Sequence, residues 1–376
     1  MTDRTAGIAV PLAGRRTLLL GLPGAALFAA GLRDARADPL DRAVAASLPD
    51  TALANLRHPA LLVAGAADTA PGLWARLLAP RLAQALSLGS AIPVSATGGR
   101  DGVTGANTFE ALTTPDGSTA MLVPGAAAIA WLAGDPRVHF DAGRWVPALA
   151  SLSSGVLVGR DPAAGGSAGL AGRTIRTAAS TVTGPELPAL LGLSLLGADP
   201  SPVFGLSEPQ DASKALADGR VDAVFLTGHD VPQRLAVLSD AGFAPIFSLG
   251  SSDEDPMARD PAASGAATFA ERFRAQSGTA PSGPLFDAFR ATAAAARLDV
   301  ALVLPMLAPP SLVARWRTAC ETALSDLGLV AAARRAQVDA VSAPECVQAL
   351  ARMNADETTQ LSLRRWIAAR PEWQHA

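Results

Sequence analysis

The strongest constraint on the fold is a regular alternation of short apolar runs with longer amphipathic segments. Residues 60–64 form an apolar run that ends at a glycine, and residues 73–86 follow with leucines at helical spacing. Strand-like runs at 92–96 and 119–123 lie on either side of a helical start at 105–112. Strands that alternate with helices predict a mostly parallel sheet covered by helices on both faces.

The same alternation continues through the rest of the chain. We expect further strands at residues 149–158, 174–178, 219–226 and 300–304. We expect further helices at residues 186–196, 212–216, 268–275, 284–298, 311–327 and 344–366. The run Ser251–Pro256 is polar and rich in helix-breaking residues, which marks a domain boundary. A length of 376 residues favours two domains.

Composition excludes several classes of protein. With 49% apolar and 17% charged residues the chain can bury a large core, and a net charge of -3 gives no basic surface for nucleic acid. Lys214 is the only lysine and follows no glycine-rich loop, which argues against a phosphate-binding lysine loop. The four histidines, His58, His139, His229 and His375, are not at ligand spacing, so we expect no metal and no cofactor.

The first 37 residues resemble an export signal. Arg15 and Arg16 precede an apolar stretch that reaches about Leu32, and Ala35 and Ala37 form an A-x-A cleavage site. The adjacent arginines indicate the twin-arginine route, with an ordinary signal peptide and a chance arginine pair as the alternative. No later stretch is long and apolar enough to span a membrane. Both readings predict a soluble protein of the periplasm.

The periplasm is oxidising, so the two cysteines, Cys320 and Cys346, could form a disulfide there. A disulfide between them would stabilise the fold by about 3 kcal/mol. The alternative is a pair of buried thiols that pack as small apolar side chains. The sequence leaves both open.

A glycine-rich loop lies between the second expected strand and the helix that follows. Gly99, Gly102 and Gly105 do not have the G-x-G-x-x-G spacing of a dinucleotide site, so we interpret the segment as a tight connection. Arg100 in this loop has the chemistry to pair with a carboxylate ligand, although most loop arginines are simply solvated.

Five short motifs occur in an order that matches a known family. They are Trp74–Leu82, with its Ala-Arg-Leu-Leu core; Thr114–Thr119, with Pro-Asp-Gly; Phe140–Ala150; Gly219–Phe225, with Gly-Arg-Val-Asp; and Leu307–Ser311. Together they resemble the periplasmic solute-binding proteins of tripartite tricarboxylate transporters, also called the Bug family. The resemblance covers nearly the whole chain after the signal.

The resemblance implies a two-domain periplasmic-binding-protein fold of type II. Each domain is expected to be a mostly parallel sheet flanked by helices, and two crossings join the domains around a ligand cleft. We expect residues 38–148 and 252–376 to form the first domain and residues 149–251 the second. It also implies a monomer that captures a small organic acid and delivers it to a membrane transporter or a sensor.

The same resemblance implies which residues bind the ligand. Backbone N–H groups of two loops grip the carboxylate in that family, and such donors bind anions without lysine. The first loop corresponds here to Gly65, Ala66, Ala67, Asp68 and Thr69, and the second to Ser180, Thr181, Thr183 and Gly184. Pro124 and Gly125, together with Thr227 and Gly228, are expected to line the same cleft.

Several positions depart from the family pattern. Ala66, Ala67, Ser180 and Val182 stand where the loops usually carry glycine, and about 20 extra residues with helical character lie before Asp299. These changes favour either a less acidic, more apolar ligand or a divergent binding protein without a transport role.

Evidence for an enzyme is weak in the sequence. The chain has no G-x-S-x-G, H-E-x-x-H or C-x-x-C motif. An exported hydrolase-like α/β enzyme is the alternative to a receptor, and it would need a nucleophile beside a histidine in the cleft. Trp131 is the tryptophan we expect at the cleft wall.

Overall fold

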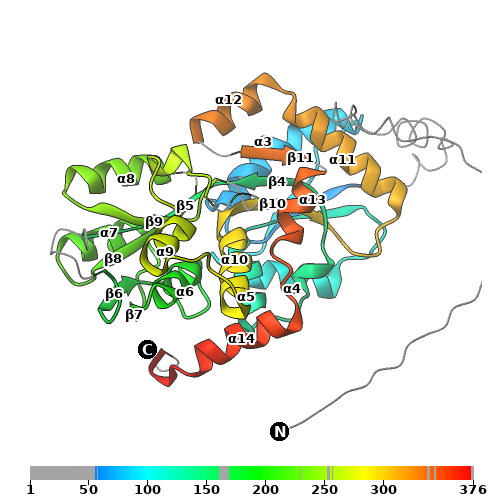
Figure 1. Cartoon of the computed structure of the whole chain (residues 1–376). Coiled ribbons are helices and arrows are strands. Elements are labelled where there is room, and N and C mark those ends of the chain that lie inside the picture. Colours follow the sequence, from blue (N-terminus) through cyan, green and yellow to red (C-terminus); the bar gives the residue numbers. More distant parts are fainter. Residues whose placement is uncertain are drawn as a thin grey trace, which may run out of the picture. The chain divides into compact units, whose positions relative to one another are not determined.

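The computed structural model describes residues 56, 58–160, 169–228, 230–251, 255, 257–336, 339–342 and 344–373. The expected export signal at residues 1–37, and most of the boundary run after Ser251, lie outside these residues. The strands within them form two sheets, each with helices on both faces (Figure 1).

The first sheet has six strands, and its central strands come from both ends of the chain. Their spatial order is β11 (Asp339–Ser342), β4 (Val146–Leu152), β10 (Leu298–Leu304), β3 (Thr119–Val123), β1 (Ala60–Val63) and β2 (Val94–Ala96). The second sheet has five strands from the middle of the chain, in the order β7 (Asp199–Val203), β6 (Thr174–Ala178), β8 (Ala223–Gly228), β5 (Ser154–Gly159) and β9 (Ala244–Ser248).

Both sheets are mixed, which corrects the expectation of mostly parallel sheets. In the first sheet β1 pairs in parallel with β2 and β3, whereas β10 is antiparallel to β3 and β4, and β11 to β4. In the second, β6 is parallel to β7 and β8, whereas β5 is antiparallel to β8 and β9. The antiparallel pairs involve the strands by which the chain leaves the first sheet and returns to it.

The single strand expected at residues 149–158 is in fact two strands in different sheets. β4 ends at Leu152 and β5 begins at Ser154, so only Ser153 separates them. The Ser153 amide donates to the Arg297 carbonyl oxygen at 2.8 Å, where the chain returns to the first sheet. The two crossings between the sheets are therefore hydrogen-bonded to each other.

Helices occupy most of the remaining described residues. They are α3 (Ala70–Ala85), α4 (Val103–Leu112), α5 (Gly125–Ala133), α6 (Leu187–Leu195), α7 (Pro209–Ala217), α8 (Val231–Asp240), α9 (Phe269–Ser277), α10 (Pro284–Arg297), α11 (Pro310–Leu324), α12 (Leu327–Ala336), α13 (Glu345–Ala351) and α14 (Glu357–Ala368). Short 3-10 turns lie at Ala142–Arg144, Pro261–Ala263 and Pro371–Trp373.

Local sequence explains where several helices begin and end. Thr268 and Glu271 form a reciprocal capping box at the start of α9. Gly134 ends α5 in the left-handed conformation that glycine adopts without strain. The single helix expected at 344–366 is two helices, because Asp356 caps α14 by accepting from the Thr359 amide at 2.8 Å.

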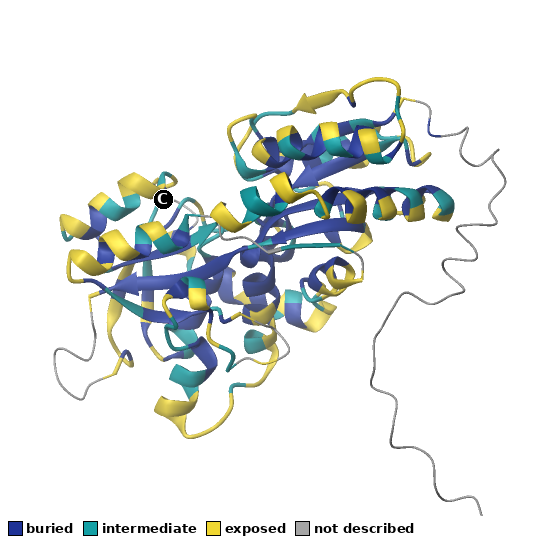
Figure 2. Cartoon of the chain, turned by 90° about the horizontal axis from the view of Figure 1, so that it is seen from above, coloured by how far each residue is buried: buried dark blue, intermediate teal, exposed yellow. Residues whose placement is uncertain are grey.

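Alternate residues of the strands enter different cores, as the two-residue period of a strand requires. In β3, Ala120 and Leu122 face a core formed with α3 and α11, while Met121 and Val123 face the opposite side. In β8, Val224 and Leu226 face a core formed with α7 and α8, while Phe225 faces the opposite side. Figure 2 shows these strands buried beneath helices whose outer faces are exposed.

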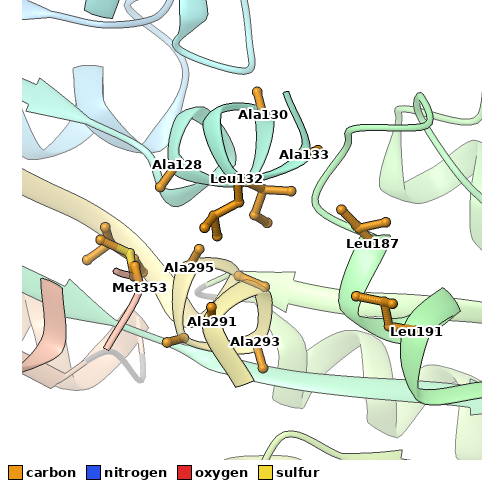
Figure 3. Close-up of a cluster of buried hydrophobic side chains, with 14 of the residues drawn as sticks. Ala128, Ala130, Leu132, Ala133, Leu187, Leu191, Ala291, Ala293, Ala295 and Met353 are labelled. Atoms are coloured by element: carbon orange, nitrogen blue, oxygen red, sulfur yellow. The ribbon is translucent and has the colours of Figure 1, made fainter. Parts of the chain in front are cut away.

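The inner faces of both sheets contribute to one continuous apolar cluster centred on α10. Figure 3 shows Ala291, Ala293 and Ala295 of this helix below Leu132 of α5, with Met353 on one side and Leu187 and Leu191 of α6 on the other. Phe289 of α10 packs against Phe269 of α9 with ring centroids 4.2 Å apart. The extra residues noted in the sequence are therefore a central helix that contacts α5, α6 and α14.

Both cysteines are buried and unbonded, which is the second of the two interpretations left open by the sequence. Cys320 lies in α11 and Cys346 in α13, and burial raises the thiol pKa of Cys346 to about 11. They therefore act as small apolar side chains in the core.

No helix in the described part of the chain is long and apolar enough to cross a bilayer. Among those same residues, no group of three or more His, Cys, Asp or Glu side chains is arranged to hold a metal ion.

The position of α10 generates a first prediction. Gly125 begins α5, and a Cβ there would overlap the Ala295 carbonyl oxygen and lie 2.7 Å from the Leu298 carbonyl oxygen. Gly125→Ala should therefore lower the free energy of unfolding by about 1–3 kcal/mol, as overpacking does. If α10 did not contact Gly125, replacing this helical glycine by alanine would raise the free energy of unfolding by about 1 kcal/mol. The sign of the measured change therefore shows whether the contact exists.

Chemical denaturation of both variants measures the effect. The control is Gly89→Ala, because a Cβ at Gly89 has no heavy atom within 4 Å. Equal stabilities of the two variants would contradict the packing of α10 against α5.

Candidate functional site

The first expected ligand loop folds onto the glycine-rich connection. Gly65–Thr69 follow β1, the Ala66 amide donates to the Gly99 carbonyl oxygen at 3.0 Å, and the Thr69 hydroxyl donates to the Ala66 carbonyl oxygen at 2.6 Å. A Cβ at Gly65 would lie 2.7 Å from the Thr69 hydroxyl oxygen, so the turn needs glycine. Ala67 and Asp68 lie in the same turn, and Asp68 is exposed.

Gly125 lies against α10 and not against open space, and Pro124 precedes it beside Gly102. Thr227 belongs to the second sheet, and its hydroxyl donates to the Ala296 carbonyl oxygen at 2.8 Å. The carbonyl oxygens of Ala295 and Leu298 lie against Gly125. The carboxyl end of α10, which carries partial negative charge, therefore lies against the N-terminus of α5, which carries partial positive charge. Gly228, at the end of β8, has φ +96°.

The second expected loop already binds a carboxylate of the protein. The Ser180 amide and hydroxyl donate to Glu186 Oε2 at 3.2 and 2.8 Å. A Cβ at Gly184 would lie 2.7 Å from the same oxygen, which explains the glycine. Burial raises the pKa of Glu186, while the bonds from Ser180 oppose that rise. Glu186 thus takes up a proton at higher pH in the folded protein than in the unfolded chain.

A second internal carboxylate links this loop to the first sheet's helices. Thr183 donates from its hydroxyl to Asp135 Oδ2 at 2.6 Å, and Asp135 follows α5. Arg137 donates to Asp135 through Nε at 3.0 Å and Nη2 at 2.7 Å, and to Asp101 through Nη1 at 2.8 Å. The chain Asp101–Arg137–Asp135–Thr183 therefore connects elements of both sheets.

Ionisation of Asp135 is favoured by these partners. Its side chain is only 5% exposed, and burial acts to raise its pKa. The hydrogen bonds from Arg137 and Thr183, with the charge of Arg137, outweigh burial and lower the pKa of Asp135. The carboxylate form of Asp135 is thus held by direct donors.

Arg100 pairs with a carboxylate, but with one that belongs to the chain. Its Nη2 lies 3.1 Å from Glu208 Oε1, in the segment before α7, and its Nη1 donates to Oε2 at 3.3 Å. The two side chains are 63% and 45% exposed. An exposed pair of this kind contributes about 0–1 kcal/mol.

A cavity of about 670 Å³ opens beside the second loop. Its lining comes from the end of α5 and the turn after it, the second loop, the residue that follows β7, and the C-terminal segment: Ala133, Gly134, Asp135, Pro136, Arg137, Ser180, Thr181, Val182, Thr183, Phe204, Arg364, Ile367, Ala368 and Trp373. This volume is in the range of small-molecule sites.

Among the residues expected from the sequence, only Ser180, Thr181 and Thr183 line this cavity. The structure does not bring Gly65–Thr69, Pro124–Gly125, Gly184 or Thr227–Gly228 to it. The sequence did not indicate Arg364, Ile367 or Trp373 as site residues, and only Arg364 lies within the amphipathic helix expected at residues 344–366. Trp131 does not line the cavity either, and it packs partly buried against the central cluster.

In the described part of the chain, neither His58 nor His139 has a side-chain hydrogen bond to a serine or cysteine. His229 and His375 lie outside the described residues.

Comparison with solved structures identifies the fold. A TctC solute binding protein from Polaromonas, solved without ligand, is similar over 83% of this chain and 98% of its own, with a TM-score of 0.59 and 13% identity. The chain has the fold of a solute-binding protein. MatC from Rhodopseudomonas palustris, solved with bound malate, matches 84% of this chain and 98% of its own, with a TM-score of 0.50 and 17% identity.

The two-domain α/β fold implied by the motifs is therefore confirmed, and the two solved proteins that share it are solute-binding proteins. No protein-family model matches the sequence, and no curated protein does.

The Asp135 network generates a second prediction. Asp135 has a lowered pKa in the folded state, so its contribution to stability is complete above the unfolded pKa and is lost as pH falls through the folded pKa. Asp135→Asn should lower the free energy of unfolding at pH 7 by about 1–3 kcal/mol. The difference from the natural protein should shrink as pH falls below about 4.

Urea denaturation between pH 7 and pH 3 tests this dependence. Asp240→Asn, at an exposed position that ends α8, is the control for removal of one negative charge. A pH-independent difference for Asp135→Asn would show that the carboxylate is not held by Arg137 and Thr183.

Proposed function

We propose that this chain is an exported solute-binding receptor that captures a small organic acid. Its fold supports the proposal, because two solute-binding proteins match nearly their whole length to this chain. The malate bound to MatC shows that a protein of similar fold accommodates a small carboxylate. This likeness is the observation that carries the proposal.

The second loop supports an acidic ligand on physical grounds. Ser180 and Thr183 already hold the carboxylates of Glu186 and Asp135 through neutral donors. A loop that binds two carboxylates without lysine has the chemistry that an organic acid needs. Binding, and not catalysis, is the function we propose for it.

Export and delivery are parts of the same proposal. The signal at residues 1–37 would place the mature chain in the periplasm as a soluble monomer without a cofactor. It would hand its ligand to a tripartite tricarboxylate-type transporter or to a sensor, with no nucleic acid as partner.

The division into domains also remains a proposal. We propose residues 38–148 with 252–376 as one domain and residues 149–251 as the other. The order of strands supports it, since β5 to β9 belong to one sheet and the earlier and later strands to the other. β4 straddles the first boundary, because it begins at Val146 and ends at Leu152 within the first sheet.

Thermal unfolding with a panel of organic acids tests the proposal. At a concentration one hundred times Kd, a ligand stabilises by about 2.7 kcal/mol and raises Tm by several degrees. We expect such a rise with at least one mono- or dicarboxylate. The matched controls are the uncharged amides of the same acids, which should leave Tm unchanged. A panel in which no acid raises Tm would refute the receptor.

A further inference from the structure

The centre of the expected cleft is occupied by α10. The Ala295 carbonyl oxygen lies where a side chain at Gly125 would begin, and the Thr227 hydroxyl is bonded to the Ala296 carbonyl oxygen. No ligand atom can occupy the same space as these groups. Gly125 and Thr227, which were expected to line the cleft from its two sides, are therefore engaged by the helix, and a ligand cannot occupy the space between them and α10.

The cavity beside the second loop offers unused donors for an anion. Among the described residues, the backbone N–H groups of Thr181, Val182 and Thr183 donate to no protein acceptor. Arg364, which also lines the cavity, donates to the Trp131 and Leu132 carbonyl oxygens and to Gln360, and its Nη1 makes no bond to a described residue.

The free Nη1 of Arg364 is a charged donor for an anion in this cavity. Arg137 donates to carboxylates through all three of its nitrogens, so its donors are used within the network that contains Asp135 and Asp101. No carboxylate in the described part of the chain forms an ion pair with Arg364. The anion-binding groups of the cavity are therefore Arg364 and the unpaired amides of residues 181–183.

The rest of the lining is apolar and fixed in position. Val182, Phe204, Ile367 and Trp373 line the cavity, and Trp373 is only 4% exposed. The Arg370 guanidinium lies 5.1 Å from the Trp373 ring centroid and 4.1 Å from that of Trp366. Trp366 in turn donates to the Ser194 hydroxyl of α6 at 3.2 Å. A rigid apolar wall thus faces the donors.

We propose that this cavity is the ligand site and that it takes an organic acid with one carboxylate and an apolar body. The carboxylate lies between the amides of residues 181–183 and Arg364, and the apolar body lies against Ile367 and Trp373. A second carboxylate would be buried against that wall without a partner, which is costly. This inference rests on the proposed receptor function and specifies its site and its class of ligand.

Isothermal titration calorimetry with matched acids tests the class of ligand. The probes are 4-methylbenzoate against terephthalate, and heptanoate against heptanedioate, so each pair differs by a methyl group and a carboxylate. We expect the monocarboxylate of at least one pair to bind at least tenfold more tightly than its partner.

Variants of the cavity test the place of binding. Arg364→Gln removes the charge and Ala368→Trp fills the space, and each should weaken binding of the monocarboxylate at least tenfold. The matched controls are Arg365→Gln and Ala369→Trp, at exposed neighbours that do not line the cavity, which should change Kd less than twofold. Circular dichroism and Tm verify that every variant is folded.

The possible outcomes separate this inference from the function it rests on. If an acid binds but Arg364→Gln and Ala368→Trp leave its Kd unchanged, or if dicarboxylates bind more tightly, the inference is overturned and the receptor function stands. If Thr69→Val abolishes binding and the cavity variants do not, the ligand site lies at the first loop, and the inference is overturned in that case too. If no acid binds the natural protein, the receptor function fails together with the inference.

Discussion

The packing of α10 is the constraint on which the rest of the structure depends. Its alanines allow its backbone to approach α5 so closely that only glycine is accommodated at Gly125. Its phenylalanines, Phe286 and Phe289, pack against Phe269 of α9, a helix that contacts β9 of the second sheet. α10 therefore contacts elements of both sheets. It also fills space in which the family resemblance predicts that a ligand binds.

The polar groups of the expected ligand loops form hydrogen bonds within the protein. Donors that would otherwise need a ligand or water are satisfied by Glu186, by Asp135 and by the last carbonyl groups of α10. A buried donor without an acceptor costs about 1–3 kcal/mol, so internal acceptors of this kind stabilise the folded loops. The departure from the family pattern at Ser180 is therefore not simply a loss, because its hydroxyl donates to Glu186.

Periodic apolar patterns were enough to predict much of the fold. The strands at Thr119–Val123 and Thr174–Ala178 occur where expected, because each is a short segment rich in apolar and β-branched residues. β7 was missed because its sequence contains two prolines, and an edge strand tolerates them. The break between β4 and β5 was missed because both strands are buried on both faces, so apolarity alone does not reveal a change of sheet.

The candidate site could be predicted only in part, for a different physical reason. Ser180, Thr181 and Thr183, which line the cavity, were expected because the family resemblance places its second ligand loop at these residues. Arg364 and Trp373 were missed because their proximity to that loop depends on the docking of α14 against α5 and α10. The extra residues were recognised as helical, but nothing in their own sequence indicated which space they would fill.

The apolar cluster around α10 has one further consequence, for folding. Separate domains of a binding protein usually have separate cores, so each can unfold while the other persists. Here Met121 and Val303 of the first sheet share a cluster with Leu157 and Phe247 of the second. Folding of either half is completed only when α10 is in place, and the chain should therefore behave as one cooperative unit whose halves are lost together.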